Sequence, residues 1–253
     1  MAVSPLGVWG HASWFGLEDL AELEQLGFGT VWLGGSPPAD LSTAEPLLAA
    51  STTLVVATGI VNVWDAEPSV AAAGYQRVAA AYPGRFVLGI GAGHRPLVGD
   101  RYTKPYDKLV SYLDGLDEGG VPESARVLAA LGPKVLRLAR DRTAGAHPYL
   151  TTPEHTAQAR EILGEGKVLA PEQKVILSTD AAEARALARK RLEIYFGLPN
   201  YTNNWLRLGF TEADLADGGS DRLIDAMVVW GNEDTIRERV QACLLYTSPS
   251  PRD

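Results

Sequence analysis

The stretch that decides the fold is Tyr82-Pro83-Gly84-Arg85-Phe86-Val87-Leu88-Gly89-Ile90-Gly91-Ala92-Gly93-His94. Its proline-glycine pair is a turn signal that ends the preceding element. Residues 86–90 then form an apolar run with the length of a buried strand. Because side chains alternate along a strand, Phe86, Leu88 and Ile90 share one face, which is bulky enough to pack under helices.

The opposite face of this strand carries Val87, Gly89 and Gly91, and it is nearly bare toward its C-terminal end. Either backbone or a flat ligand could approach such a face closely. The strand opens into a glycine-rich, cationic loop that ends in His94 and Arg95. We therefore expect a ligand site at the C-terminal end of a buried strand.

Six further strand candidates alternate with helical segments along the chain, at residues 6–9, 30–33, 54–61, 126–131, 146–150 and 174–178. The predicted helices cover residues 16–26, 43–50, 68–81, 106–116, 135–142, 156–163 and 181–196, with a short helix and loop within 197–219 and another helix from 232. This alternation predicts a parallel sheet, and seven such units approach the eight of a TIM (β/α)8 barrel. We predict one α/β barrel domain over residues 1–242.

The C-terminal segment breaks this pattern. An eighth strand is due after Ala242, but residues 243–253 contain two prolines and two serines behind a short apolar triplet. A disordered tail is one interpretation. We prefer another, because the eleven residues look like one reading frame of a common transposase sequencing adapter. Residues 243–253 are then a non-native tail on a barrel truncated before strand 8.

Composition excludes several classes of protein. A formal net charge of −8 and a pI near 5.1 argue against a general nucleic-acid binder, which would need a basic face. The single cysteine, Cys243, provides neither a disulfide framework nor a metal site, and we expect no metal. No apolar run could span a bilayer and no signal peptide is evident, so we expect a cytoplasmic protein without a membrane partner.

Ligands and catalysis in TIM barrels sit on the loops that follow the strands, and those loops hold His11, His94 and His155. His94 could donate a hydrogen bond to a bound ring or transfer a proton, or it could hold local backbone. His11 lies between Trp9 and Trp14 in the sequence. It could act as a general acid or base in an aromatic pocket, or simply pack against a tryptophan.

Gly132-Pro133-Lys134 opens a predicted helix and combines free N–H groups, the positive helix end and a lysine. This combination predicts an anion site, although an ordinary proline-started helix has the same sequence. The glycines at 89, 91 and 93 do not form the dinucleotide fingerprint, because His94 stands where that pattern requires glycine. Zinc-hydrolase and serine-hydrolase motifs are absent from the sequence.

Residues 83–94 resemble the signature of the luciferase-like monooxygenase family, which includes F420-dependent oxidoreductases of actinobacterial type. Shorter pieces agree in order, at residues 6–9, 27–33, 57–60, 131–136 and 152–155. The resemblance implies a TIM-like barrel that binds F420, or alternatively FMN, at its C-terminal rim. It also implies a small-molecule substrate.

The resemblance further implies which residues hold the cofactor. The kinked end of strand three would back the ring, the loop after strand four would touch the ring or ribityl chain, and backbone N–H groups after strand five would cradle the phosphate. The implied cofactor-binding residues are Val61, Asn62, Val63, Trp64, Gly91, Gly93, His94, Ala130, Leu131, Gly132, Pro133 and Lys134. Lys134, Arg137 and Arg140 are candidates for binding a glutamylated F420 tail.

Many members of the family carry an acidic residue and a histidine just after strand two, where this chain has Gly34-Gly35-Ser36. We therefore take His11 and His94 as the catalytic candidates. The favoured function is F420-dependent hydride transfer. The alternatives are an FMN-dependent monooxygenase that uses O2 and a separate reductase, a non-catalytic flavin-binding barrel, and an unrelated lyase or isomerase acting on a phosphorylated substrate. A homodimer is the oligomer we expect.

Overall fold

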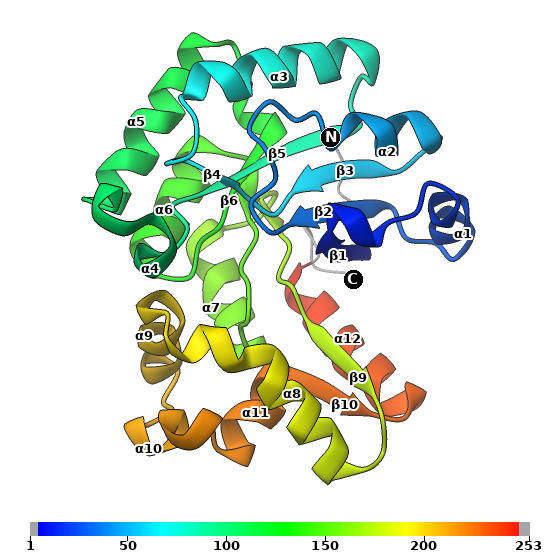
Figure 1. Ribbon diagram of the computed structural model, residues 1–253, viewed down its shortest axis with the longest axis vertical. Coiled ribbons are helices and arrows are strands. Elements are labelled where there is room, and N and C mark those ends of the chain that lie inside the picture. Colours follow the sequence, from blue (N-terminus) through cyan, green and yellow to red (C-terminus); the bar gives the residue numbers. More distant parts are fainter. Residues whose placement is uncertain (1–4, 248–253) are drawn as a thin grey trace.

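The computed structural model describes residues 5–247, and a curled parallel sheet organises the N-terminal two thirds of them (Figure 1). Its strands are β1 (Gly7–His11), β2 (Thr30–Gly34), β3 (Val55–Thr58), β4 (Val61–Asn62), β5 (Phe86–Gly91), β6 (Arg126–Leu128), β7 (Gly145–Ala146) and β8 (Val168–Leu169). They pair in the order β1-β2-β3-β5-β6-β7-β8, with β4 also on β5. The predicted α/β barrel fold is confirmed as a half-barrel of seven strand positions, and within residues 5–247 no strand joins β8 to β1.

Helices cover the outer face of this sheet (Figure 1). They are α1 (Asp19–Gln25), α2 (Glu45–Ala50), α3 (Pro68–Ala81), α5 (Pro105–Glu118), α6 (Pro133–Arg142) and α7 (Pro153–Leu163). The short helix α4 (Arg95–Val98) follows the carboxyl end of β5, and 3-10 turns lie at Ala12–Trp14, Gly99–Arg101 and Glu123–Ala125. The helices α3, α5, α6 and α7 each begin at a proline. Proline suits the first helical position because that residue needs no N–H donor, and this explains where these helices start.

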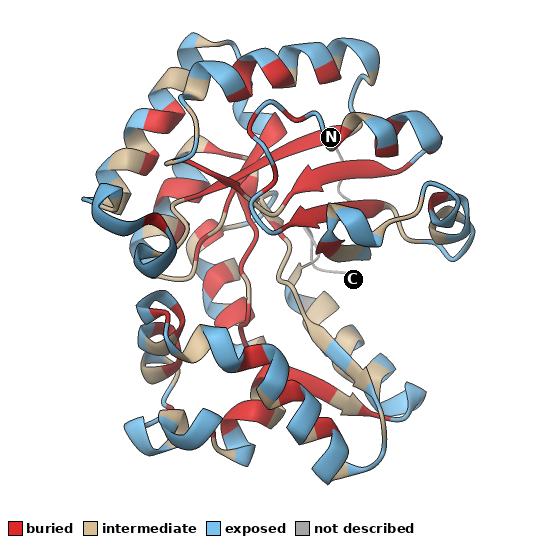
Figure 2. Ribbon diagram, viewed as in Figure 1, coloured by how far each residue is buried: buried red, intermediate tan, exposed pale blue. Residues whose placement is uncertain are grey.

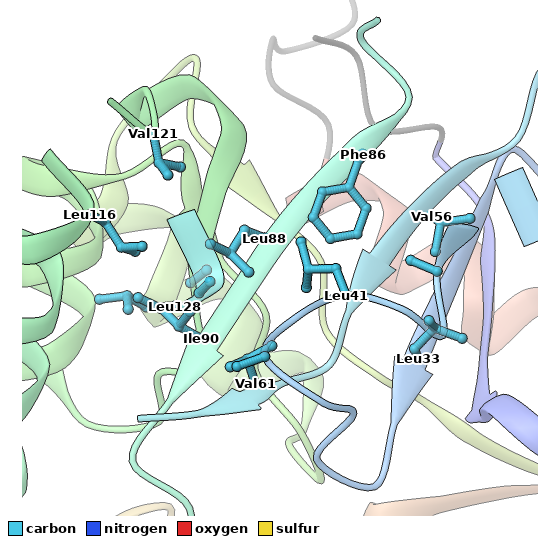
Figure 3. Close-up of a cluster of buried hydrophobic side chains, with 14 of the residues drawn as sticks. Leu33, Leu41, Val56, Val61, Phe86, Leu88, Ile90, Leu116, Val121 and Leu128 are labelled. Atoms are coloured by element: carbon cyan, nitrogen blue, oxygen red, sulfur yellow. The ribbon is translucent and has the colours of Figure 1, made fainter. Parts of the chain in front are cut away.

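The bulky face of β5 packs under these helices, as predicted. Phe86, Leu88 and Ile90 are 3%, 0% and 0% exposed and belong to one buried cluster with Leu116 and Leu128 (Figure 3). Burying side chains of this size stabilises the fold by about 1.5–3 kcal/mol each. The opposite face points into the half-barrel, where Val87 joins a second, smaller cluster.

One extra residue distorts the strand next to β5. In β3, Val56 and Ala57 pair with residues 30 positions later, whereas in β4 Val61 and Asn62 pair with residues 29 positions later. The strand predicted over residues 54–61 therefore contains a bulge, which bends it between Thr58 and Val61. At this bend the Thr58 side chain is hydrogen-bonded to both the N–H and the carbonyl oxygen of Gly89, each at 2.8 Å.

The C-terminal part of the chain forms a smaller unit below the sheet in Figure 1. It contains β9 (Lys174–Leu177), β10 (Val228–Gly231), α8 (Ala181–Phe196), α9 (Pro199–Arg207), α10 (Glu212–Leu215), α11 (Asp221–Met227) and α12 (Glu233–Thr247), with a 3-10 turn at Ala216–Gly218. Here β9 and β10 pair in a separate two-stranded parallel sheet.

The assignment of residues 174–178 to the seventh barrel strand was wrong. That position is taken by β8, whose two residues are too short to produce a periodic signal in the sequence. Val175 and Leu177 of β9 are 51% and 67% exposed, and β9 is only partly buried in Figure 2, because helices cover one face of the small sheet. Its apolar run was therefore misread as a buried barrel strand.

Two other predictions changed in detail. The strands predicted over residues 126–131 and 146–150 end at Leu128 and Ala146, and the remaining residues form rim loops.

The sequence showed no sign of α11 and β10. Helix α12 continues beyond Ala242 to Thr247, whereas residues 248–253 of the predicted tail lie outside the described residues. The origin of residues 243–253 stays a prediction.

Gly89→Ala should destabilise the protein by about 3 kcal/mol or more, because an added Cβ would overlap the Thr58 carbonyl oxygen on the neighbouring strand. Gly197→Ala is the matched control, since the nearest atom to its Cβ would be 3.6 Å away and its φ of −86° suits alanine. We expect the control to change stability by less than about 0.5 kcal/mol. Urea unfolding of both variants measures this, and equal stabilities would contradict the close approach at Gly89.

Candidate functional site

The carboxyl ends of the strands form one rim, and two of the predicted cofactor loops meet there. Asn62, which is 8% exposed, follows the bulge and accepts a hydrogen bond from the Trp64 N–H at 3.2 Å. Its amide nitrogen faces Gly93, where an added Cβ would lie 2.8 Å away. The Trp64 indole N–H donates to the Ala92 carbonyl oxygen at 2.8 Å. The structure thus holds the loops after β4 and β5 against each other.

Within these loops the side chains divide into two groups. Val61 and Val63 are 1% and 0% exposed and belong to the hydrophobic core, as does Ala130 after β6. Only their backbone could contact a cofactor. Gly91 packs against the side chains of Ile60 and Ala129. The bare face noted in the sequence is therefore filled by neighbouring backbone at Gly89 and by side chains at Gly91.

His94 lies on this rim beside the first turn of α9. Its Nδ1 is 3.4 Å from the Asn200 amide nitrogen, which also donates to the Gly93 carbonyl oxygen at 3.1 Å. An amide nitrogen only donates, so Nδ1 accepts and the proton is assigned to Nε2. Burial lowers the pKa of His94, which favours the neutral ring with one free N–H donor.

His11 is exposed and contacts a different part of the rim. Its Nδ1 is 2.8 Å from the Ser13 hydroxyl, and its ring lies against Gly35. Among the described residues no ring contact joins His11 to Trp9 or Trp14, so neither the aromatic pocket nor the packing on a tryptophan gains support. No hydrogen bond or ring contact joins His11 to His94 in residues 5–247 either.

The predicted anion site lies at the start of α6. Gly132 is the N-cap residue, and no side chain caps this helix end. Lys134, however, places its ammonium 3.7 Å from the centre of the Tyr106 ring, and Arg140 pairs with Asp141 at 2.7 Å. His155 lies in the first turn of α7, where its N–H donates to the Thr152 side chain, and its Nε2 donates to the Leu131 carbonyl oxygen at 2.8 Å.

A cluster of polar and aromatic side chains that the sequence did not reveal lies where β7 and β8 end. The Lys174 ammonium is 3.0 Å from a Glu172 oxygen and donates to the Tyr149 hydroxyl at 2.8 Å. That hydroxyl is 2.8 Å from the hydroxyl of Tyr195 on α8. Burial raises the pKa values of Glu172, Tyr149 and Tyr195.

These side chains connect the two sides of the rim. The Tyr149 ring packs on Trp9 of β1 at 5.1 Å, and Tyr195 packs on Tyr201, whose ring is 5.2 Å from His94. Whichever tyrosine hydroxyl donates to the other, one O–H hydrogen of the pair has no acceptor among the described residues. The cluster can therefore donate to an oxygen atom of a ligand.

The fourth histidine, His147, lies inside the half-barrel. Its ring stacks on Trp32 at 4.1 Å and 15°, and its Nδ1 is 2.6 Å from the Ala170 carbonyl oxygen. Its Nε2 and the Trp9 indole nitrogen both face Gly59 and have no partner in the described part of the chain. The burial of His147 lowers its pKa to about 4.

Both Glu172 and Lys174 could have been noticed in the sequence, because residues two apart in an extended segment share a face. Assigning residues 174–178 to a barrel strand hid this spacing. Tyr149 was likewise placed within a predicted strand, and Tyr195 and Tyr201 reach the rim only through the folding of α8 and α9.

Other kinds of site receive no support in residues 5–247. No group of three or more His, Cys, Asp or Glu side chains could hold a metal ion there. No helix in the same range is both long and apolar enough to cross a membrane. Cavities of about 390 and 160 Å³ lie away from the rim, the first beside β10 and α12 and the second beside α3 and β5.

The half-barrel with its site at the C-terminal rim defines a TIM-barrel type of enzyme scaffold. Residues 15–118 match the family model described as luciferase-like monooxygenase, so the resemblance noted in the sequence is confirmed. No curated protein sequence matches the chain. The structural neighbours include F420-dependent enzymes and monooxygenases.

Three solved structures share the fold. An F420-dependent secondary alcohol dehydrogenase, in complex with an F420-acetone adduct, is 14% identical and has a TM-score of 0.67, covering 91% of this chain and 86% of its own. The coenzyme F420-dependent tetrahydromethanopterin reductase from Methanopyrus kandleri is 14% identical, with a TM-score of 0.62 and coverage of 97% and 91%. The oxygenating constituent of 3,6-diketocamphane monooxygenase from Pseudomonas putida, in complex with FMN, is 16% identical, with a TM-score of 0.67 and coverage of 97% and 90%.

His147 should make the protein less stable in acid. Its pKa is about 4 in the folded protein and near 6.5 when unfolded, so its stabilising contribution is complete above pH 6.5. That contribution is lost as the pH falls from 6.5 to 4, by about 1.4 kcal/mol per pH unit and about 3 kcal/mol in total. His147→Phe keeps a ring on Trp32 and should unfold with a shallower acid dependence in urea titrations at pH 7.5, 5.5 and 4.5. A parallel pH dependence in both proteins would contradict the burial of a neutral His147.

Lys174→Met should destabilise the protein by about 2–4 kcal/mol, because it leaves the Glu172 carboxylate, whose side chain is 8% exposed, without its cation. Adding Glu172→Gln should restore at least about 1 kcal/mol. Arg237→Met, which breaks an ion pair exposed by 62% and 81%, is the control and should change stability by less than about 0.5 kcal/mol. Additive effects in the double variant, measured by urea unfolding, would show that Lys174 and Glu172 are not coupled.

Proposed function

We propose that this chain is an F420-dependent oxidoreductase that transfers hydride to or from a small organic substrate. The observation that supports it most is the convergence of three loops on one rim, at residues 62–64, 92–94 and 131–132. The Trp64–Ala92 hydrogen bond joins the first two loops. Helix α9 reaches the second through Asn200 and lies beside the third through Arg207.

The residues on this rim fit a cofactor with a flat ring and a phosphate. The buried amide nitrogen of Asn204 is a donor without a partner in residues 5–247, its side chain holds Arg207 beside Gly132, and Gly132 leaves open the space that a side chain would occupy. The backbone of residues 61–64 and 91–93 would back the ring, and the uncapped start of α6 would bind the phosphate. When bound, F420 supplies the hydride chemistry.

The chain's own groups would then handle the proton. His94 holds a proton on Nε2 and offers it as a hydrogen-bond donor beside the loop after β5. The Tyr149–Tyr195 pair keeps one uncommitted O–H, supported by the Lys174 ammonium. A substrate oxygen bound between these groups would be polarised by an N–H and an O–H donor while the aromatic rings of the cluster exclude water. We assign His94 the catalytic role before His11, which is exposed and turned toward Ser13.

An FMN-dependent monooxygenase that receives reduced flavin from a separate reductase is the alternative, and the FMN complex on the same fold supports it. A homodimer in the cytoplasm remains part of the proposal. A lyase or isomerase would need an acidic residue and a lysine at the strand ends, and Glu172 and Lys174 lie there. However, the Lys174 ammonium is already paired with Glu172 and donates to the Tyr149 hydroxyl.

The purified protein should bind F420 with a dissociation constant in the micromolar range and at least about tenfold more tightly than FMN. Fluorescence titration with each cofactor measures this. Under anaerobic conditions the reduced deazaflavin should be oxidised by a panel of small aldehydes and ketones, and its fluorescence should then reappear.

Two outcomes separate the alternatives. Tighter binding of FMN, together with O2 consumption when reduced FMN is added, would replace the F420 proposal by the monooxygenase. Binding of neither cofactor at micromolar concentration would rule out both.

A further inference from the structure

Arg207, the last residue of α9, has no acidic partner. Its only hydrogen bond among the described residues goes to the Asn204 side-chain oxygen at 2.9 Å, and no carboxylate in that range lies within 4.0 Å. The guanidinium is therefore available to an external anion.

The guanidinium lies over the start of α6. A Cβ added to Gly132 would be 3.6 Å from the Arg207 Nη2 atom. Helix α6 has 10 residues, its N-cap glycine offers no side chain, and the Lys134 ammonium rests on Tyr106 instead of the helix end. A positive charge from α9 thus lies at this helix start.

Two buried polar groups beside this position also lack partners. Asn204 is 1% exposed, and its amide nitrogen has no hydrogen-bond acceptor in residues 5–247, although its oxygen is bonded to Arg207. His155 is 3% exposed, and its Nδ1 is unpaired while its Nε2 is bonded to the carbonyl oxygen of Leu131. Unpaired buried polar groups are rare in folded proteins, and the unpaired Asn204 amide donor next to a free guanidinium indicates a missing ligand. Because Nε2 of His155 carries the ring proton, its Nδ1 is an acceptor and does not contact an anion directly.

The chemistry of these groups selects an oxyanion. A guanidinium offers two parallel N–H donors to phosphate oxygens, the amide of Asn204 adds N–H donors, and the helix start favours negative charge. We propose that α9 provides a phosphate-binding arm, in which Asn204 orients Arg207 over the start of α6 to bind the phosphate group of the cofactor. This inference rests on the proposed function, and it replaces Lys134 by Arg207 as the main cation of the phosphate site.

The same helix carries the contact to His94. Asn200 in the first turn of α9 is bonded to Gly93, and Trp205 donates to the Leu150 carbonyl oxygen at 3.3 Å. A phosphate bound by Arg207 would therefore help to hold α9 in place across the rim. Binding of the cofactor's phosphate group would in this way position His94, which contacts Asn200 at the other end of α9.

The test compares ligands with and without a phosphate. Arg207→Gln should weaken FMN or F420 binding by about tenfold or more and leave riboflavin binding unchanged, because riboflavin has no phosphate. Arg207→Lys should recover part of the loss. Arg191→Gln is the matched control and should bind every ligand as the wild type does, because Arg191 is an exposed arginine on α8 that forms no ion pair or side-chain hydrogen bond among the described residues.

Inorganic phosphate gives an independent measurement. It should compete with FMN and raise the melting temperature of the wild type, and it should do neither in Arg207→Gln. Equal phosphate and FMN binding by the wild type and Arg207→Gln would overturn the phosphate-binding arm and leave the proposed function intact. Phosphate binding that depends on Arg207 in a protein that binds no F420 or flavin would support the arm and overturn the proposed function. Loss of riboflavin binding in Arg207→Gln would also overturn the arm, since it would show a general defect.

Discussion

The close approach of β3 and β5 at Thr58 and Gly89 is the constraint on which the rest of the structure depends. The Thr58 hydroxyl both donates to and accepts from the Gly89 backbone, and it replaces ladder bonds where the bulge begins. Because the bulge adds one residue, β4 pairs with β5 in a register shifted by one residue, and Asn62 is turned toward Gly93. A side chain at position 89 would prevent this approach, and the loops at residues 62–64 and 92–94 would no longer be held together.

Helix α9 is the second element that organises the rim. It follows the barrel strands in the chain and touches the loops after β5 and β7 through hydrogen bonds, and it places a guanidinium beside the loop after β6. Its buried face, with Tyr201 and Trp205, belongs to a core cluster separate from that of the sheet. The helix therefore packs on the smaller unit and presents its polar residues to the rim, which lets a structural element also contribute to ligand binding.

Polar groups inside and at the mouth of the half-barrel are costly unless they are paired. The hydrogen bonds and the ion pair within the cluster of Glu172, Lys174, Tyr149 and Tyr195 offset much of this cost. By contrast, the Trp9 indole nitrogen and the His147 Nε2 face Gly59 and have no partner in the part of the chain that the structure describes. A half-barrel filled only with aliphatic residues would be easier to stabilise. The position of these groups next to the rim supports a role in ligand binding, and burial shifts the pKa values of Glu172, Tyr149, Tyr195 and His147.

The sequence by itself determined the alternation of strands and helices, the buried strand at residues 86–90 with its outward bulky face, and the rim loops after the strands, because these depend on local periodicity and on turn and capping residues. Only the tertiary structure decided that residues 168–169, and not 174–177, occupy the seventh barrel position, since a two-residue strand is defined by its neighbours alone. It also decided which polar groups meet. Lys134 turns to Tyr106, while Arg207, Tyr149 and Lys174 reach the rim from segments far apart in the chain. Such meetings depend on how helices pack across the sheet, which no local pattern of residues encodes.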